Sequence, residues 1–168
     1  MASGRQLQLA KQTGEYLVAS ELCRRGLIAT TFTGNVPHYD IIASDETGGH
    51  VPIQVKALRT GAWQLDIRKF AELELKDGKQ YVGKPIKLKF PDLICVFLQL
   101  SYYGKDSFYL MEWKDLQAKV IRDYKKNLKK HGGARPRKPD SGHCIIAPSQ
   151  MAKFRDNWSI IKKALDSQ

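Results

Sequence analysis

The chain has 168 residues, which is enough for one compact domain with its own hydrophobic core. Lys and Arg number 28 against 17 Asp and Glu, and the formal net charge of +11 favours a polyanionic partner, most commonly nucleic acid. The three cysteines are scattered along the chain, which excludes a disulfide framework and a zinc-binding spacing.

The sequence contains no signal peptide and no apolar run of membrane-spanning length. We therefore expect a cytoplasmic or nucleoid-associated protein without a membrane partner. The basic excess alone leaves a second interpretation open, because a ribosome-associated or merely basic soluble protein has a similar composition.

The first predicted element is a helix over residues 7–25. Gly26 follows it, as is common for the residue after a helix C-terminus. Glu15 lies beside the apolar side of this helix, so we expect its carboxylate to lean over the edge of a sheet. Residues 27–32 then predict a short strand. The helical spacing is carried by Leu7, Ala10, Leu17, Val18 and Leu22.

A hairpin follows, because two short apolar runs flank a Gly-rich turn at residues 45–49. Asp40 opens its first strand, while Gln54 and Lys56 lie on the second and point to one face. A carboxylate, an amide oxygen and an ammonium therefore meet at one end of the hairpin, and such oxygens suit a hard divalent cation. The alternative is a polar hairpin whose outer face carries these residues by chance.

The middle of the chain predicts a further set of short elements. Residues 63–67 alternate as a strand, residues 70–75 predict a helical turn, and residues 78–90 predict a loop or a flexible hairpin. The almost continuous apolar run at residues 93–100 predicts a strand that is buried on both faces. Residues 108–111 are expected to pair with it.

A basic helix–loop segment is expected over residues 113–142, with the helix at residues 113–130. Gly and Pro break the segment after the helix, so it cannot form a core of its own. We expect it to have few internal contacts and therefore to be mobile without a ligand. Dense like charges are stabilised mainly by phosphates, which predicts nucleic-acid binding, with a solvated surface as the alternative. The predicted binding residues are Arg59, Lys125, Lys126, Lys129, Lys130, Arg135, Arg137 and Lys138.

Three smaller features complete the chain. Residues 143–147 predict an edge strand, and residues 149–166 predict a last helix with Ser149 as its N-cap. Tyr102 and Tyr103 could stack on bases, although such a pair at a strand end more often packs on the core.

Four motifs occur in order: Gly14-Glu15, then Leu22 and Gly26, then residues 39–43, then Gln54-Val55-Lys56. Together they resemble the PD-(D/E)xK nuclease superfamily, most closely its restriction-endonuclease-like and Holliday-junction-resolvase-like members. The resemblance covers about the first third of the chain, and residues 93–100 more loosely. Gln54 stands where the family pattern has its second acid, so the chain resembles a QxK variant.

The resemblance implies an α/β fold with a restriction-endonuclease-like core, in which helices flank a mixed sheet of about four or five strands. It implies a single nuclease-like domain over residues 1–168. The activity it implies is that of a metal-dependent DNA endonuclease that hydrolyses phosphodiester bonds. Because a small nuclease that cuts both strands usually needs two active sites, we also expect a symmetric homodimer. The alternatives are a catalytically inactive DNA-binding module of the same fold and a protein-interaction domain with an incidental positive charge.

The resemblance also implies roles for single residues. Asp40, Gln54 and the backbone carbonyl of Val55 would bind Mg²⁺, with Mn²⁺ as a second candidate. Glu15 would hold the metal through water or bind a second ion, and Lys56 would orient or deprotonate the attacking water. Because Gln54 carries no charge, the site would attract a dication less strongly than a site with a second acid.

Overall fold

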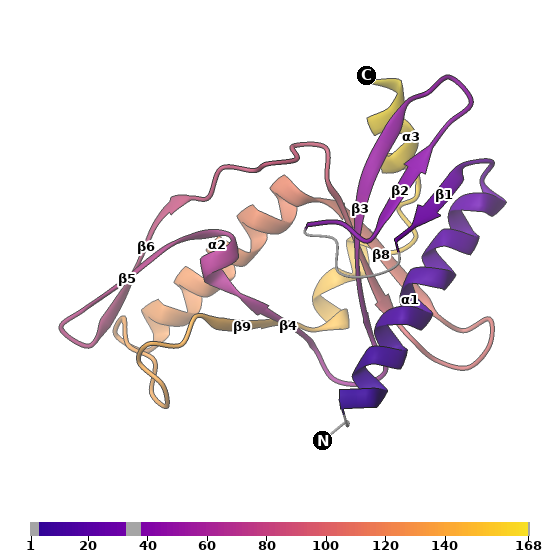
Figure 1. The fold of residues 1–168 in the computed structure, drawn as a ribbon. Coiled ribbons are helices and arrows are strands. Elements are labelled where there is room, and N and C mark those ends of the chain that lie inside the picture. The colour runs from indigo at the N-terminus through magenta and orange to yellow at the C-terminus, as the bar shows by residue number, and fades with distance from the viewer. Residues whose placement is uncertain (1–3, 33–37, 168) are drawn as a thin grey trace. The chain divides into compact units, whose positions relative to one another are not determined.

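A five-stranded mixed sheet forms the centre of the fold (Figure 1), and its strand order is β1-β2-β3-β7-β8. The pairs β1–β2, β2–β3 and β7–β8 are antiparallel, whereas β3–β7 is parallel. This arrangement confirms the predicted α/β fold with helices flanking a mixed sheet, and it places the hairpin at the sheet centre. The strands are β1 (Ile28–Thr31), β2 (Ile41–Ser44), β3 (His50–Leu58), β7 (Ile94–Gln99) and β8 (Ser107–Glu112).

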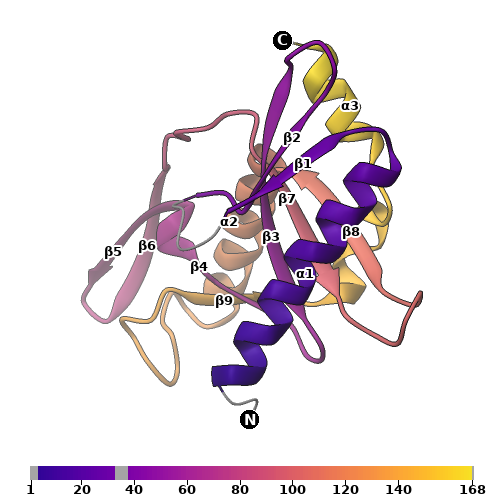
Figure 2. The same ribbon diagram turned by 45° about the vertical axis from the view of Figure 1, so that its right-hand side comes forward.

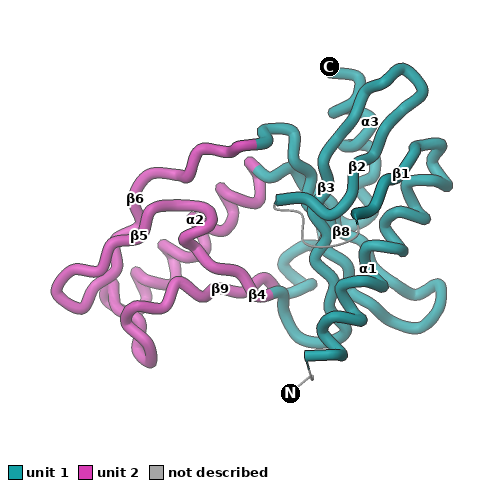
Figure 3. The backbone as a smooth tube through the Cα atoms, in the orientation of Figure 1, with its two compact units in different colours: residues 1–63, 90–113, 147–168 teal, residues 64–89, 114–146 magenta. Residues whose placement is uncertain are grey.

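The structure is a computed structural model and describes residues 4–32 and 38–167. Two compact units can be distinguished by the contacts within them (Figure 3). Unit 1 comprises residues 1–63, 90–113 and 147–168, and unit 2 comprises residues 64–89 and 114–146. That these units act as one domain remains a prediction.

Strand β3 has one buried face and one half-exposed face. Val51, Ile53 and Val55 are buried, while the residues between them are only partly buried. This alternation is the pattern of a strand with a core on one side. Strand β7 is different, because Ile94 to Leu98 are all buried, as the continuous apolar run predicts.

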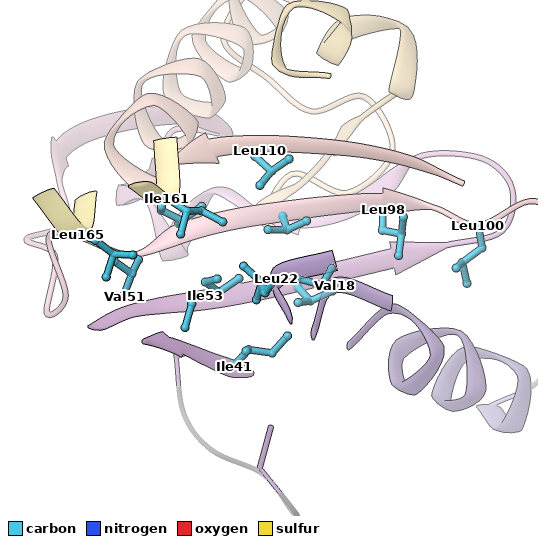
Figure 4. Close-up of a cluster of buried hydrophobic side chains, with 14 of the residues drawn as sticks. Val18, Leu22, Ile41, Val51, Ile53, Leu98, Leu100, Leu110, Ile161 and Leu165 are labelled. Atoms are coloured by element: carbon cyan, nitrogen blue, oxygen red, sulfur yellow. The ribbon is translucent and has the colours of Figure 1, made fainter. Parts of the chain in front are cut away.

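Helix α1 (Gly4–Arg24) covers the buried face of β3 in unit 1 (Figures 1 and 2). Its residues Val18 and Leu22 belong to the main hydrophobic cluster (Figure 4). Helix α3 (Ser159–Asp166) adds Ile161 and Leu165 to the same cluster. In the described part of the chain, no helix is both long and apolar enough to cross a membrane.

Gly14 brings α1 unusually close to the sheet. A Cβ atom added at Gly14 would overlap the Cβ of Ala57 on β3 and would lie 3.5 Å from Cγ1 of Val55. Only a residue without a side chain allows this approach. The contact fixes the position of Glu15, the next residue on the helix, relative to β3.

Unit 2 contains α2 (Trp113–Lys130) from residue 114 onwards and two small sheets, apart from Trp63, the first residue of one sheet, which belongs to unit 1. In the first small sheet, β4 (Trp63–Asp66) pairs with β9 (His143–Ile146). In the second, β5 (Ala71–Lys76) pairs antiparallel with β6 (Lys79–Pro85). The amide of Gln117 on α2 donates to the carbonyls of Phe70 at 2.7 Å and Ile86 at 2.8 Å, which ties the helix to the hairpin.

Two predicted elements differ from the structure. Residues 70–75 are mostly strand β5 and not a helical turn, and residues 79–85 form its partner strand. The last helix is divided: a 3-10 helix, η2 (Pro148–Phe154), precedes α3. Asp156 lies between them with a φ of 51° and donates its backbone N–H to the carbonyl of Phe108, so one continuous helix cannot form.

Candidate active site

Asp40 lies at an open edge of β3. Its backbone N–H donates to the carbonyl of Ile53 at 2.8 Å, directly before Ile41, the first residue of β2 that pairs with β3. Its carboxylate then accepts the backbone N–H of Val55 at 2.8 Å. The two polar backbone groups of a strand residue point to the same side, so the carbonyl of Val55 faces this edge as well. Asp40 therefore takes the place of a partner strand at Val55.

Glu15 reaches the same edge from α1. The Nζ atom of Lys11 lies 3.6 Å from Oε1 of Glu15 and 3.7 Å from Oδ1 of Asp40, so both carboxylates converge on one ammonium. Their side chains are only 17% and 16% exposed. Burial, followed by the negative charge of Asp40, raises the pKa of Glu15, and Lys11 partly opposes this shift.

Gln54 and Lys56 flank Val55 on the half-exposed face of β3, opposite the face that α1 covers. In the parallel register, Gln54 stands beside Cys95 on β7. Burial raises the pKa of the Cys95 thiol to about 12, while the charge of Lys56 lowers this pKa and the charge of Asp40 raises it. Lys56 and Asp40 are therefore both close enough to Cys95, the neighbour of Gln54 on β7, to interact with it electrostatically.

The residues at this edge fit a hard divalent cation by their chemistry. Two carboxylates already converge on a positive charge, and the carbonyl of Val55 faces the same side of the strand. Among the described residues, no group of three or more His, Cys, Asp or Glu side chains could hold a metal. A metal here would therefore depend on amide, backbone or substrate oxygens in addition to Glu15 and Asp40.

Lys11 is the residue of this site that the sequence analysis did not identify. Its spacing of four residues before Glu15 is a signal for a helical ion pair, because residues four apart lie on the same side of a helix. Its approach to Asp40 could not be read from the sequence, since that contact depends on how α1 packs on β3.

The predicted nucleic-acid-binding residues are mostly exposed. Arg59 follows the end of β3 in unit 1 and is exposed. The other residues lie in unit 2, on the last turns of α2 and in the loop after it. Residues 125–138 contain seven basic and no acidic residues, so the surface they form is strongly positive. The exposed members are Lys125, Lys126, Lys129, Lys130, Arg137 and Lys138.

The loop after α2 has more internal contacts than the sequence analysis expected. The carbonyl of Gly133 accepts the backbone N–H of Gln80 at 2.8 Å, and the hydroxyl of Tyr124 donates to the Gln80 side chain at 2.6 Å. Arg135 donates to the carbonyl of His143 at 2.9 Å and stacks over the ring of Tyr124. The expectation of few internal contacts was wrong, and Arg135 has a structural role.

Tyr102 and Tyr103 do not pack on the core. They are 86% and 99% exposed in the turn between β7 and β8. The turn is held by hydrogen bonds from the N–H of Ser101 to Asp106 and from the N–H of Lys105 to the carbonyl of Tyr102. These bonds fix the turn while leaving both rings in solvent.

Comparison with known proteins gives a likeness of fold. No protein-family model and no curated protein matches the chain. Among solved structures, the chain is similar to the bacterial homing endonuclease I-Ssp6803I, with a TM-score of 0.55, 13% sequence identity and 96% of each chain covered. The chain therefore has a fold like that of a known endonuclease.

Proposed function

We propose that this protein is a metal-dependent DNA endonuclease of the PD-(D/E)xK type, with Gln54 in the position of the second acid. The observation that carries the proposal is the convergence of Glu15 and Asp40 at the open edge of β3. Gln54 and Lys56 flank this edge, on a fold like that of a homing endonuclease. The net charge of +11 supports a nucleic-acid substrate.

Each residue has a role in the proposed reaction. Asp40, Gln54 and the carbonyl of Val55 would hold Mg²⁺ or Mn²⁺, and Glu15 would hold it through water. A bound dication would neutralise charge on the phosphate and lower the pKa of a bound water. Lys56 would orient the attacking water and stabilise negative charge that develops on the phosphate.

The hydrogen bond between Asp40 and Val55 prepares the site for this reaction. It fixes one carboxylate oxygen on the backbone of a central strand, which holds the side chain in place before substrate binds. Sites with preorganised charges need little rearrangement during the reaction, and this lowers the barrier. The basic residues after α2 would hold the sugar–phosphate backbone without reading sequence.

A cleavage assay with two active-site variants tests the proposal. Plasmid, linear and four-way-junction DNA are incubated with Mg²⁺ or Mn²⁺ and the wild-type protein, Asp40→Ala or Lys56→Ala. We expect both variants to lose cleavage by at least about a hundredfold, as removal of one charge-stabilising group in an active site does. DNA affinity should change by less than about threefold, because these residues are few among the phosphate contacts.

The matched controls are Glu46→Ala in the exposed hairpin turn and Lys105→Ala in the β7–β8 turn. Both should cut at the wild-type rate. Wild-type cleavage by either active-site variant would show that the site is wrongly assigned.

A protein that cuts both strands of a duplex needs two active sites, and we therefore propose a symmetric homodimer. Sedimentation in the presence of DNA would test this oligomeric state.

The alternative function is a DNA-binding module without catalysis. The position of Lys11 favours it, because its ammonium bridges the two carboxylates that a metal would need. Titration with Mn²⁺ separates the two functions. Saturable binding that Asp40→Ala removes supports the nuclease, whereas no binding with or without DNA supports the module.

A further inference from the structure

A pocket of about 330 Å³ opens beside the candidate active site in unit 1. It lies on the half-exposed face of β3, because Pro52 alternates with the buried residues in the same way as Gln54. Its volume is at the lower end of the range of small-molecule sites, about 300–1,000 Å³. The residues that line it include Tyr39, Ile42, His50, Pro52, Phe90 and Asp92.

Two of the residues that line this pocket, Tyr39 and Phe90, belong to a group of aromatic rings in contact. The rings of Tyr39 and Phe90 meet edge to face with centroids 5.5 Å apart, and the His38 ring lies 5.7 Å from Phe90. The ring of Phe32 packs edge to face against that of Tyr39, with centroids 5.6 Å apart. Tyr39 and Phe90 are only half-buried, so part of each ring remains available for a ligand. A flat aromatic ligand can stack on one of these two perpendicular rings and meet the other edge to face.

The pocket lies next to the proposed catalytic residues along the chain. Tyr39 is the covalent neighbour of Asp40, and Pro52 precedes Gln54 by two residues on the same face of β3. Two residues along a strand span about 7 Å. A ligand in the pocket and a phosphate at Asp40 can therefore belong to one nucleotide or to adjacent nucleotides.

We propose that the pocket binds one unpaired nucleobase of the DNA substrate, next to the phosphate that is cut. This inference rests on the proposed function. Every base has an aromatic face that can stack on the ring of Phe90 while its edge meets the ring of Tyr39, because the two rings lie nearly perpendicular to each other. Asp92 accepts N–H donors from the edge of a base, and its negative charge excludes the phosphate backbone from the pocket. A base that is paired and stacked in a duplex cannot enter, so the preferred substrate carries an unpaired nucleotide.

Binding to three labelled duplexes tests the inference. They differ at one position, which carries a bulged guanine, a bulged abasic site or no bulge, and anisotropy is measured in EDTA so that nothing is cut. We expect the guanine bulge to bind about tenfold more tightly than the abasic bulge, as stacking of one base on an aromatic side chain gives. Phe90→Leu, which keeps an apolar side chain, should reduce this ratio to below about threefold.

Two further variants keep the test decisive. Tyr103→Ala removes an aromatic ring that is 99% exposed and lies outside the pocket, so it should leave the tenfold ratio unchanged. Asp92→Asn should reduce the preference for a bulged guanine over a bulged thymine, because guanine offers two donors to a carboxylate and thymine one. Loss of the ratio in Tyr103→Ala, with the ratio kept in Phe90→Leu, would assign base stacking to the β7–β8 turn and overturn the inference.

Cleavage separates this inference from the proposed function. A wild-type protein that cuts DNA but binds both bulges equally refutes the pocket and leaves the nuclease intact. A protein that cuts nothing but keeps a base preference dependent on Phe90 retains the pocket as part of a DNA-binding module. Absence of any DNA binding refutes both.

Discussion

Lys11 places a positive charge between the two carboxylates of the candidate site. Its ammonium lies less than 4 Å from both Glu15 and Asp40, where a dication would have to compete with it. Two unit charges 4 Å apart interact by about 1 kcal/mol in water, which corresponds to a factor of about five in affinity. The charge of this residue therefore sets how strongly the site attracts metal.

We predict that Lys11→Ala raises the affinity for Mn²⁺ by about fivefold or more, because the competing charge is removed. Isothermal titration calorimetry without DNA measures this effect directly. Lys105→Ala, which removes an exposed lysine from the β7–β8 turn, is the control and should bind Mn²⁺ like the wild type. An unchanged affinity in Lys11→Ala would show that the ammonium does not occupy the metal position in solution.

Glu15 makes stability depend on pH. Burial and the charge of Asp40 raise its pKa above 4.5, so the folded protein holds this proton more strongly than the unfolded chain does. The resulting contribution to stability is fully present below the unfolded pKa. It is lost as pH rises through the folded pKa.

We predict that the wild-type free energy of unfolding falls relative to that of Glu15→Gln as pH rises from about 4.5 to 7, because Gln does not titrate. Urea denaturation at several pH values measures the difference. Glu46→Gln, at an exposed position in the hairpin turn, should differ from the wild type by a constant amount. A constant difference for Glu15→Gln would mean that Glu15 is not desolvated.

At the scale of elements, the crossing of α1 over β3 decides where the site forms. Gly14 allows this crossing because a side chain there would overlap Ala57. Replacing Gly with Ala in a helix gains about 0.5–1 kcal/mol from backbone entropy. Overpacking a core costs about 1–3 kcal/mol, so the loss exceeds the gain at this position.

We predict that Gly14→Ala lowers the free energy of unfolding by about 1–2 kcal/mol and reduces cleavage more than DNA binding, because α1 carries Glu15 away from Asp40. The double variant Gly14→Ala, Ala57→Gly restores the space and should recover most of the activity. Urea denaturation and cleavage of the single and double variants form a complete cycle. Equal cleavage by wild type and Gly14→Ala would show that the close crossing of α1 over β3 is not needed for an active site.

The sequence predicted those elements in which the spacing of apolar residues and the length of the segment indicate the same type of secondary structure. The hairpin, the buried strand β7 and helix α2 lie where their patterns place them. Strand β5 was missed although Glu-Leu-Glu-Leu alternates with a period of two, because Glu, Leu and Lys all favour helices. The turn signal was present as well: Asp77 and Gly78 have φ angles of 50° and 72°, which is typical of a tight hairpin turn.

The candidate site was predictable only in part. Motif order indicated Glu15, Asp40, Gln54 and Lys56, but it could not place Lys11 against Asp40. The contacts of the loop after α2 were hidden for the same reason. They join Gln80 to Tyr124 and Gly133, which lie more than 40 residues away along the chain, and such pairs leave no local pattern.

At the scale of the whole molecule, the positive charge is concentrated in one segment. Lys129, Lys130 and Arg137 are exposed near the end of α2 and in the loop after it, whereas Arg135 is held by His143 and Tyr124. Charges that contact phosphates release counterions, and each contact steepens the dependence of affinity on salt. A lysine or arginine that contacts no phosphate adds to the net charge of the protein, but it does not steepen this dependence through a contact of its own.

We predict that replacing Lys129, Lys130 and Arg137 by Ala makes the slope of log affinity against log salt less negative by up to about 2.7, since each duplex phosphate contact contributes about 0.9 to that slope. The loss should be the same for different DNA sequences, because phosphate contacts do not read bases. Fluorescence anisotropy at several salt concentrations measures the slope. The charge-matched control replaces Lys153, Lys162 and Lys163, three exposed lysines of η2 and α3.

Both triple variants remove the same net charge, so only their positions differ. A flatter slope in the first variant alone shows that the segment after α2 contacts phosphates. Equal changes in both variants would mean that overall charge and not this segment drives binding. Arg135→Ala adds a separate check, because Arg135 donates a hydrogen bond to the carbonyl of His143. Its loss should lower the free energy of unfolding by about 1 kcal/mol. The slope of log affinity against log salt should change little.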